Sequence, residues 1–131
     1  MSENLSASVR AYLEEQSAVV RSGVYWNCLT AAMKLCELLF AEGASPWIAR
    51  VRKTETVNGE PFHFPLIPRG TEVKRAWTTH YVCCSEGFAQ EPLAGAPVEL
   101  ESYALEVFGE EIELEVFLTA EELEAELKKR S

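Results

Sequence analysis

Apolar positions at helical spacing distinguish the segment of residues 27–43. The apolar side chains recur at intervals of three and four, at Leu29, Ala32, Met33, Cys36, Leu39 and Phe40. That spacing predicts one apolar face of an α-helix. Asn27 is a suitable N-cap residue because its side-chain oxygen can accept a hydrogen bond from a free N–H of the first turn. Gly43 can adopt the left-handed conformation that ends a helix, so we expect the helix to stop there.

Three further segments have helical periodicity. Residues 1–22 carry the apolar positions of an amphipathic helix, and residues 99–108 place theirs on one face of a short helix. A last helix follows Leu118. It begins with Thr119-Ala120-Glu121-Glu122, which fits the capping box, and it ends in three basic residues that suit the negative end of the helix dipole.

Other segments favour β-structure. Residues 46–53 predict a first strand, and residues 72–85 lead into a second strand that is rich in β-forming side chains. Glu86-Gly87 is a tight turn, after which residues 88–91 pair back as a third strand until Pro92 ends it. The second and third strands therefore form a β-hairpin.

A cleaner alternation of apolar and acidic side chains occupies residues 111–118. It predicts a half-buried antiparallel or edge strand whose glutamates face solvent. The side chains expected to face inward are Ile112, Leu114, Val116 and Leu118.

Residues 54–72 contain the strong turn signal Asn58-Gly59 together with prolines that interrupt regular structure. A connection of this length inside a compact domain is usually mobile or forms a functional flap. We therefore expect an irregular, mobile flap over the candidate site, with Phe62-His63-Phe64 giving it an apolar tip. His63 itself is expected to be structural or solvated.

Together these elements predict an α+β fold in one domain, residues 1–131. In this fold a central helix packs on a small antiparallel sheet, with further helices at both ends. The chain is long enough for a hydrophobic core without disulfide or metal staples, and its 47% hydrophobic and 25% charged residues are ordinary for a globular protein. No apolar run can cross a bilayer and no secretory signal is visible, so we expect a cytoplasmic protein with no membrane partner. The four cysteines are then expected to be reduced thiols.

The net charge of −9 is unevenly distributed, with −2 in residues 1–49, +3 in residues 50–75 and −10 in residues 76–131. Such an acidic chain is a poor nucleic-acid binder, because phosphate contacts need clustered Lys and Arg. The basic middle either flanks a cleft for acidic groups or, as we prefer, complements the Glu-rich C-terminal third. All 21 acidic residues are Glu, so a catalytic role usually taken by Asp falls here to Glu, Asn or Gln.

Cys28 occupies the first position of the central helix, where the helix dipole favours the thiolate that acts as a nucleophile. On the helix alone, a small buried side chain is the commoner role for a cysteine. The hairpin changes this assessment, because the start of one antiparallel strand lies beside the end of the other. His80 at the start can therefore neighbour Glu91 or Gln90 at the end. If the helix start packs at that end of the sheet, a thiolate, a base and an orienting group converge.

These residues resemble the papain-like and transglutaminase-like superfamily over roughly residues 25–95. The segment from Cys28 through the Leu-rich helix to Gly43 and an apolar strand resembles the nucleophile segment of that superfamily. His80-Tyr81-Val82 and Gln90-Glu91-Pro92-Leu93 resemble its His strand and the Asp-Pro turn that follows. Small bacterial papain-fold toxins and deamidases share this order and approximate size.

The resemblance implies a thiol-dependent acyl hydrolase or transferase with a Cys28-His80-Glu91 (or Gln90) triad. Its substrate would be an amide or acyl group of a protein or peptide, in a peptidase, glutamine deamidase or transglutaminase-like reaction that needs no cofactor. The chain departs from the family in having Glu91 where Asp is usual. No Gln lies a few residues ahead of Cys28, so Asn27, Trp26 or the Cys28 N–H is expected to form the oxyanion hole.

The sequence also bears on two alternatives to a thiol enzyme, a zinc site and a binding module. Cys83 and Cys84 are adjacent in a strand, so their side chains face opposite ways and cannot bind one metal ion, and we expect no zinc site. The main alternative to an enzyme is a catalytically inactive papain-fold binding or immunity-type module that presents the acidic C-terminal strand and helix.

Overall fold

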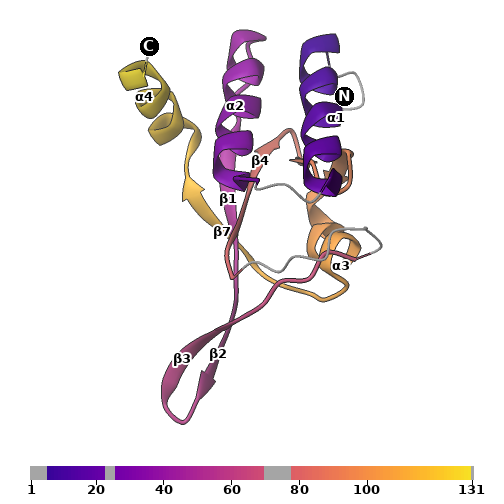
Figure 1. The fold of residues 1–131 in the computed structure, drawn as a ribbon. Helices are drawn as coiled ribbons and strands as arrows, with labels where there is room; N and C mark the ends of the chain where they lie inside the picture. The colour runs from indigo at the N-terminus through magenta and orange to yellow at the C-terminus, as the bar shows by residue number, and fades with distance from the viewer. Residues whose placement is uncertain (1–5, 23–25, 70–77, 131) are drawn as a thin grey trace.

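The computed structural model describes residues 6–22, 26–69 and 78–130, and within them the chain is α+β, as predicted (Figure 1). The parts of predicted elements at residues 1–5, 23–25 and 70–77 lie outside the described residues. The helices are α1 (Ala7–Ser22), α2 (Cys28–Ala41), α3 (Tyr103–Phe108, preceded by a 3-10 turn at Leu100–Ser102) and α4 (Ala120–Arg130). The strands are β1 (Trp47–Val51), β2 (Lys53–Val57), β3 (Glu60–Phe64), β4 (His80–Ser85), β5 (Phe88–Glu91), β6 (Ala96–Glu99) and β7 (Leu114–Leu118).

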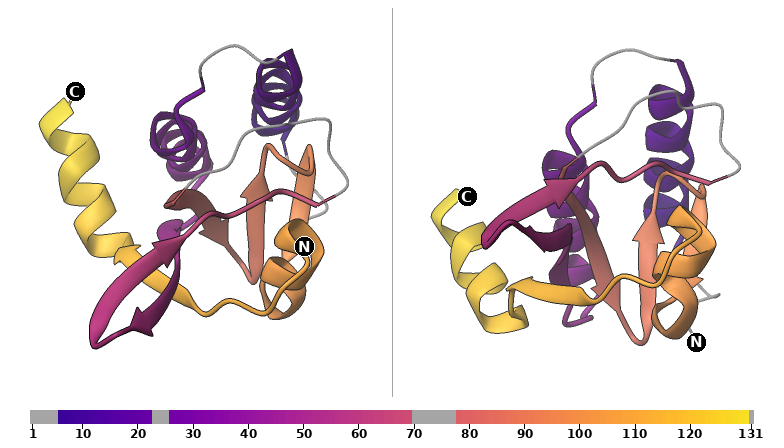
Figure 2. Two further views of the ribbon diagram at one scale, coloured as in Figure 1. Left: turned by 60° about the horizontal axis from the view of Figure 1, so that its bottom comes forward. Right: turned by 90° about the horizontal axis from the view of Figure 1, so that it is seen from below.

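Five strands form one antiparallel sheet in the order β6-β5-β4-β1-β7. Successive side chains of a strand face opposite sides of a sheet, and here both sides are covered. Ile48 and Cys83 pack in one apolar cluster with side chains of α1, α2 and α4. Ala49 and Val82 pack in a second cluster with α3 and the first turn of α2. Figure 2 shows α1 and α2 side by side along the sheet and α3 beside β5 and β6.

The predicted helix caps are formed. The Asn27 side-chain oxygen accepts a hydrogen bond from the Thr30 N–H at 3.0 Å, which starts α2 at Cys28. Thr119 and Glu122 make the reciprocal bonds of the capping box at 3.2 and 2.9 Å. Gly43 follows α2 with a φ of +86°, the left-handed conformation that ends a helix. No helix of the described residues is long and apolar enough to span a membrane.

The prediction of an irregular flap over residues 54–72 is wrong for residues 54–64, whereas residues 65–69 belong to no helix or strand, as expected. Residues 53–64 form a regular two-stranded hairpin, β2–β3, that turns at Asn58-Gly59. Both turn residues have positive φ, 53° and 80°, which is the turn geometry that suits the twist of a hairpin. The hairpin projects from the body (Figure 1) and most of its residues are exposed, so it does not cover the candidate site. His63 bonds Thr54 on its surface, which agrees with a structural or solvated role.

Two further strand predictions need correction. The strand β6 at residues 96–99 was not predicted; it tolerates Pro97 because it is an edge strand of the sheet. In β7, Val116 is 58% exposed rather than facing inward. The pairing of β1 with β7 shifts register between Ile48 and Ala49, and such an irregularity changes which side chains face the core.

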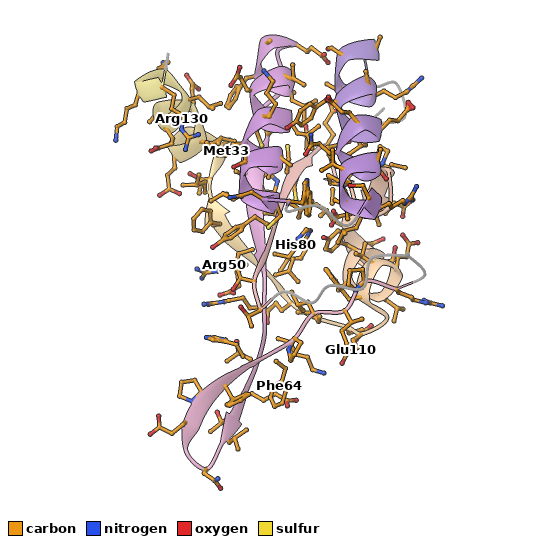
Figure 3. All side chains as sticks on the ribbon, in the orientation of Figure 1. Met33, Arg50, Phe64, His80, Glu110 and Arg130 are labelled. Atoms are coloured by element: carbon orange, nitrogen blue, oxygen red, sulfur yellow. The ribbon has the colours of Figure 1, made fainter. Side chains whose placement is uncertain are left out.

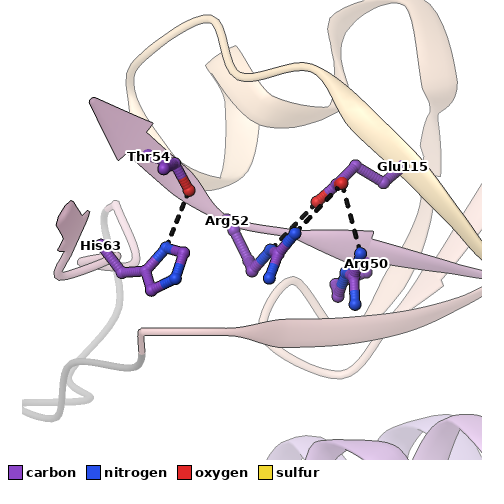
Figure 4. A network of polar contacts seen from close by, with 5 residues as sticks. All are labelled: Arg50, Arg52, Thr54, His63 and Glu115. Carbon is purple, nitrogen blue, oxygen red and sulfur yellow. Dashed lines mark hydrogen bonds and ion pairs between the residues drawn. The ribbon is translucent and has the colours of Figure 1, made fainter. Parts of the chain in front are cut away.

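The basic middle of the chain neutralises part of its acidic C-terminal third, the interpretation that we preferred. Two arginines bind Glu115 of β7 (Figure 4): Arg50 of β1 at 3.3 Å, and Arg52, which links β1 to β2, at 3.1 Å. Lys53 binds Glu110 at 2.6 Å. These ion pairs are partly exposed, so they contribute little stability individually. The Arg50–Glu115 pair joins β1 to the edge strand β7.

Candidate active site

The fold brings the start of α2, the start of β4 and the end of β5 together. β4 and β5 pair antiparallel, with Cys83 opposite Gln90, so His80 at the start of β4 lies beside Glu91 at the end of β5. Cys28 is 8% exposed, and His80 and Glu91 are fully buried. Figure 3 shows His80 below the N-terminal end of α2, between this helix and α3. The convergence expected from hairpin geometry is therefore present.

Glu91 holds the imidazole of His80 through a buried hydrogen bond, 2.8 Å between His80 Nε2 and Glu91 Oε1. The Tyr103 hydroxyl donates to the same Oε1, and the Leu93 N–H donates to Oε2 at 3.1 Å. Both carboxylate oxygens are thus occupied by donors from within the fold. This set of bonds fixes the carboxylate, and the carboxylate in turn fixes the orientation of the ring.

Cys28 meets the same imidazole. The thiol and the ring each shift the pKa of the other, as two neighbouring groups do. Because His80 Nε2 is bonded to Glu91, Nδ1 is the ring nitrogen that remains for the thiol. The imidazole therefore lies between the thiol and the carboxylate, in the order required for proton transfer from a nucleophile to an oriented base.

The pKa values of this pair are shifted in opposite directions. Burial opposes the charged form of His80, but the Glu91 carboxylate and the hydrogen bonds to Cys28 and Glu91 outweigh it and raise the pKa of His80 to about 10. Burial would likewise raise the pKa of Cys28, but the neighbouring His80 ring and its positive charge lower this pKa below its usual value. Both shifts favour a thiolate paired with an imidazolium over the uncharged pair.

Cys83 and Cys84 have pKa values shifted in the direction opposite to that of Cys28. Burial raises the pKa of Cys84 to about 12, and burial together with the neighbouring Cys36 raises the pKa of Cys83. No group of three or more His, Cys or acidic side chains in the described part of the chain could hold a metal ion.

Gln90, the alternative orienting residue, is on the other side of the sheet. It is paired opposite Cys83, whose side chain packs toward α1, α2 and α4. Its side-chain amide is buried without a hydrogen-bond partner among the described residues, so it makes no hydrogen bond to His80. Adjacent strand residues face opposite ways, which explains why Glu91 alone meets the imidazole.

The oxyanion-hole candidates are placed unequally. Trp26 is buried, and its Nε1 donates to Gln16 at 2.9 Å, so this N–H is already used. Asn27 is exposed and uses its side-chain oxygen to cap α2, which leaves its NH₂ group as a donor. The backbone N–H of Cys28 has no acceptor within the helix that it begins. Asn27 and the Cys28 N–H therefore remain the better candidates.

The sequence prediction missed Tyr103, which the structure places at the centre of the site. This residue was assigned only to the apolar face of the short helix, yet a buried tyrosine needs a partner for its hydroxyl. That requirement, next to a buried glutamate, was the available signal. Two aromatic rings flank the imidazole as well, Trp26 at 6.0 Å and Phe108 at 5.8 Å between ring centroids.

No protein-family model, no curated protein and no solved structure matches the chain.

Proposed function

We propose that the chain is a cysteine-dependent acyl hydrolase or acyltransferase with Cys28 as nucleophile, His80 as general base and acid, and Glu91 as the group that orients the imidazole. The observation that carries the proposal is a buried imidazole that Glu91 holds through Nε2 and that lowers the pKa of the Cys28 thiol. Such a pair has the two properties required of a nucleophilic thiol, a lowered pKa and an adjacent proton acceptor.

In the reaction we propose, the Cys28 thiolate attacks a carbonyl carbon of an amide and forms a C–S bond. The His80 imidazolium gives its proton to the departing nitrogen as the C–N bond breaks, which leaves a thioester on Cys28. Water or an amine then attacks this thioester, His80 accepts the proton from the attacking group, and the C–S bond breaks. Peptidase, glutamine deamidase and transglutaminase-like reactions share these steps.

Glu91 takes the position in which the papain-like superfamily has Asp. One extra methylene would normally move the carboxylate, but the Tyr103 hydroxyl and the Leu93 N–H hold it where it reaches His80. The resemblance to the papain-like superfamily, the protein or peptide substrate and the cytoplasmic location remain parts of this proposal.

One observation favours the alternative, a catalytically inactive binding module of the same fold. Cys28 is 8% exposed and His80 is fully buried, so a substrate carbonyl has little access to the sulfur in this conformation. An acyl-transfer test separates the two functions, because a binding module needs no reactive thiol.

The test uses p-nitrophenyl acetate, a small ester that transfers acetyl groups to activated thiols. The wild-type chain should release p-nitrophenol in a burst, with the acetyl group on Cys28 by mass spectrometry, and then turn over. Cys28→Ser and His80→Ala should lose both the burst and the adduct, and Cys84→Ser, the matched control, should keep them. Acetylation that is equal in wild type and His80→Ala would favour the binding module.

A further inference from the structure

A second pair of sulfur atoms meets in the core, away from the catalytic groups. Cys36 lies in the middle of α2 and Cys83 in the middle of β4, and their Sγ atoms are 2.8 Å apart. Both residues are fully buried. A covalent S–S bond measures about 2.05 Å, so the two sulfurs need to approach by less than about 1 Å to bond.

The surroundings of the pair limit what it can do. Cys36 and Cys83 belong to the apolar cluster between α1, α2, α4 and the sheet, which includes Met33, Leu35 and Ile48. Within the described part of the chain, the other polar contact of the Cys36 sulfur is the carbonyl oxygen of Trp47, at 4.0 Å. Two thiols without a third ligand do not make a zinc site, which takes four. Two adjacent thiols can instead be oxidised to a disulfide.

Cys84 provides an internal comparison. It follows Cys83 directly, but its side chain packs in the other apolar cluster, on the opposite side of the sheet, with its sulfur 3.8 Å from the carbonyl oxygen of Val82. It is therefore a cysteine of the same strand and similar burial that cannot reach Cys36.

We propose that Cys36 and Cys83 form a reversible disulfide that links α2 to β4 when the protein meets a low-molecular-weight disulfide. One cysteine attacks a sulfur of the small disulfide and releases the first small thiol, leaving a mixed disulfide. The second cysteine attacks the protein sulfur of that mixed disulfide and releases the second small thiol. Overall, two protein thiols lose two hydrogens and one small disulfide gains them.

The burial of both sulfurs sets the rate of this reaction. Attack requires a thiolate, and burial raises the pKa of Cys83, so oxidation should wait for local opening between α2 and β4. The same burial shields the product from reductants. We therefore expect slow formation and slow reduction of this bond.

The bond would join the helix that carries Cys28 to the strand that carries His80. It spans 47 positions of sequence, so it would constrain the unfolded chain substantially. For a domain of this size the midpoint of thermal unfolding should rise by about 10 °C.

The test is made in a Cys28→Ala background, so that the activated thiol takes no part and the outcome does not depend on the proposed function. The folded protein is incubated with oxidised glutathione in urea below its unfolding transition, which allows local opening. Free thiols are then alkylated, and the protein is digested without reduction for mass spectrometry. We expect a peptide cross-linked between Cys36 and Cys83 and the rise in unfolding temperature.

Two variants complete the test in the same background. Cys84→Ser should keep the cross-link and the temperature shift, and Cys83→Ser should lose both. If the Cys83→Ser chain does not fold, the cross-link in the Cys84→Ser chain still decides the question. The proposal is overturned if oxidation yields only glutathione adducts, cross-links that include Cys84, or no cross-link at all.

Discussion

Replacing Glu91 by Gln tests the electrostatics of the candidate site without changing its shape. Gln keeps an oxygen that can accept from His80 Nε2 and the Tyr103 hydroxyl, but it removes the negative charge. It also places an NH₂ group opposite the Leu93 N–H, which donates to Glu91 in the wild type. The variant should therefore fold with a modest loss of stability, about 1–3 kcal/mol for the lost hydrogen bond.

The magnitude of the electrostatic effect follows from the pKa of His80, which is about 10 against an ordinary value of 6.5. The difference is about 3.5 units, and the charge of Glu91 is the largest contribution that raises it. If Glu91 supplies about half of the shift or more, the pKa of His80 should fall by about 2 units in Glu91→Gln, which corresponds to about 3 kcal/mol at 1.36 kcal/mol per unit.

The measurement is an NMR titration of the histidine ring signals from about pH 5 to about pH 11. The chain has two histidines, and exposed His63 on the hairpin gives a second ring signal that should be the same in both proteins. In the wild type the His80 signal should remain that of an imidazolium well above neutral pH, and in Glu91→Gln it should change at lower pH. A wild-type His80 that deprotonates near or below pH 7, or an identical titration in the variant, would refute the reasoning.

Three further outcomes are expected. The pKa of His80 is raised in the folded protein, so protonated His80 stabilises the fold. This stabilisation is fully present below pH 6.5 and is lost as the pH rises through about 10. The wild-type unfolding temperature, followed by circular dichroism, should therefore fall more steeply over this range than that of Glu91→Gln; parallel curves would count against the charge pair. Tyr103→Phe should lower the free energy of unfolding, measured in urea, by about 1–3 kcal/mol because it removes a buried hydrogen bond. The control Tyr12→Phe should lower it by less than about 0.5 kcal/mol, and similar losses in the two variants would contradict the assigned bond. Phe62→Ser, at a side chain that is 54% exposed on the hairpin, should change the unfolding free energy by no more than about 0.5 kcal/mol, and a larger loss would mean that the hairpin packs on the body.

The parts of the site that could be predicted from sequence rest on local geometry. The Asn27 cap places Cys28 at the first position of α2, and the antiparallel hairpin places His80 beside Glu91. Both conclusions need only helix periodicity and strand pairing between neighbours in the chain. The alternation of side chains along a strand allows only one of Glu91 and Gln90 to face His80, and the structure shows that it is Glu91.

The parts that were missed depend on packing between distant segments. Tyr103 reaches Glu91 only because α3 packs on the sheet beside β5. The contact of Cys36 with Cys83 likewise depends on how α2 sits on β4. The exposure of Val116 follows from a register shift between β1 and β7 that no single segment encodes.

The β2–β3 hairpin shows a different limit. Its turn signal, Asn58-Gly59, was recognised, but the surrounding prolines led to the prediction of irregular structure, and the β-branched residues Thr54, Thr56 and Val57 were not used. In an isolated two-stranded hairpin both strands are edge strands. Pro61, which lacks an N–H, is therefore tolerated there, because no further strand needs that hydrogen bond.

The most direct test of the account is the relative reactivity of the four cysteines with iodoacetamide near pH 6, read residue by residue by mass spectrometry. If His80 holds Cys28 as a thiolate, Cys28 should be labelled at least about ten times faster than Cys36, Cys83 or Cys84, and His80→Ala should abolish this advantage. Labelling of Cys28 that is no faster than that of the other three, or that does not change in His80→Ala, would contradict the claim that these residues form a nucleophilic site.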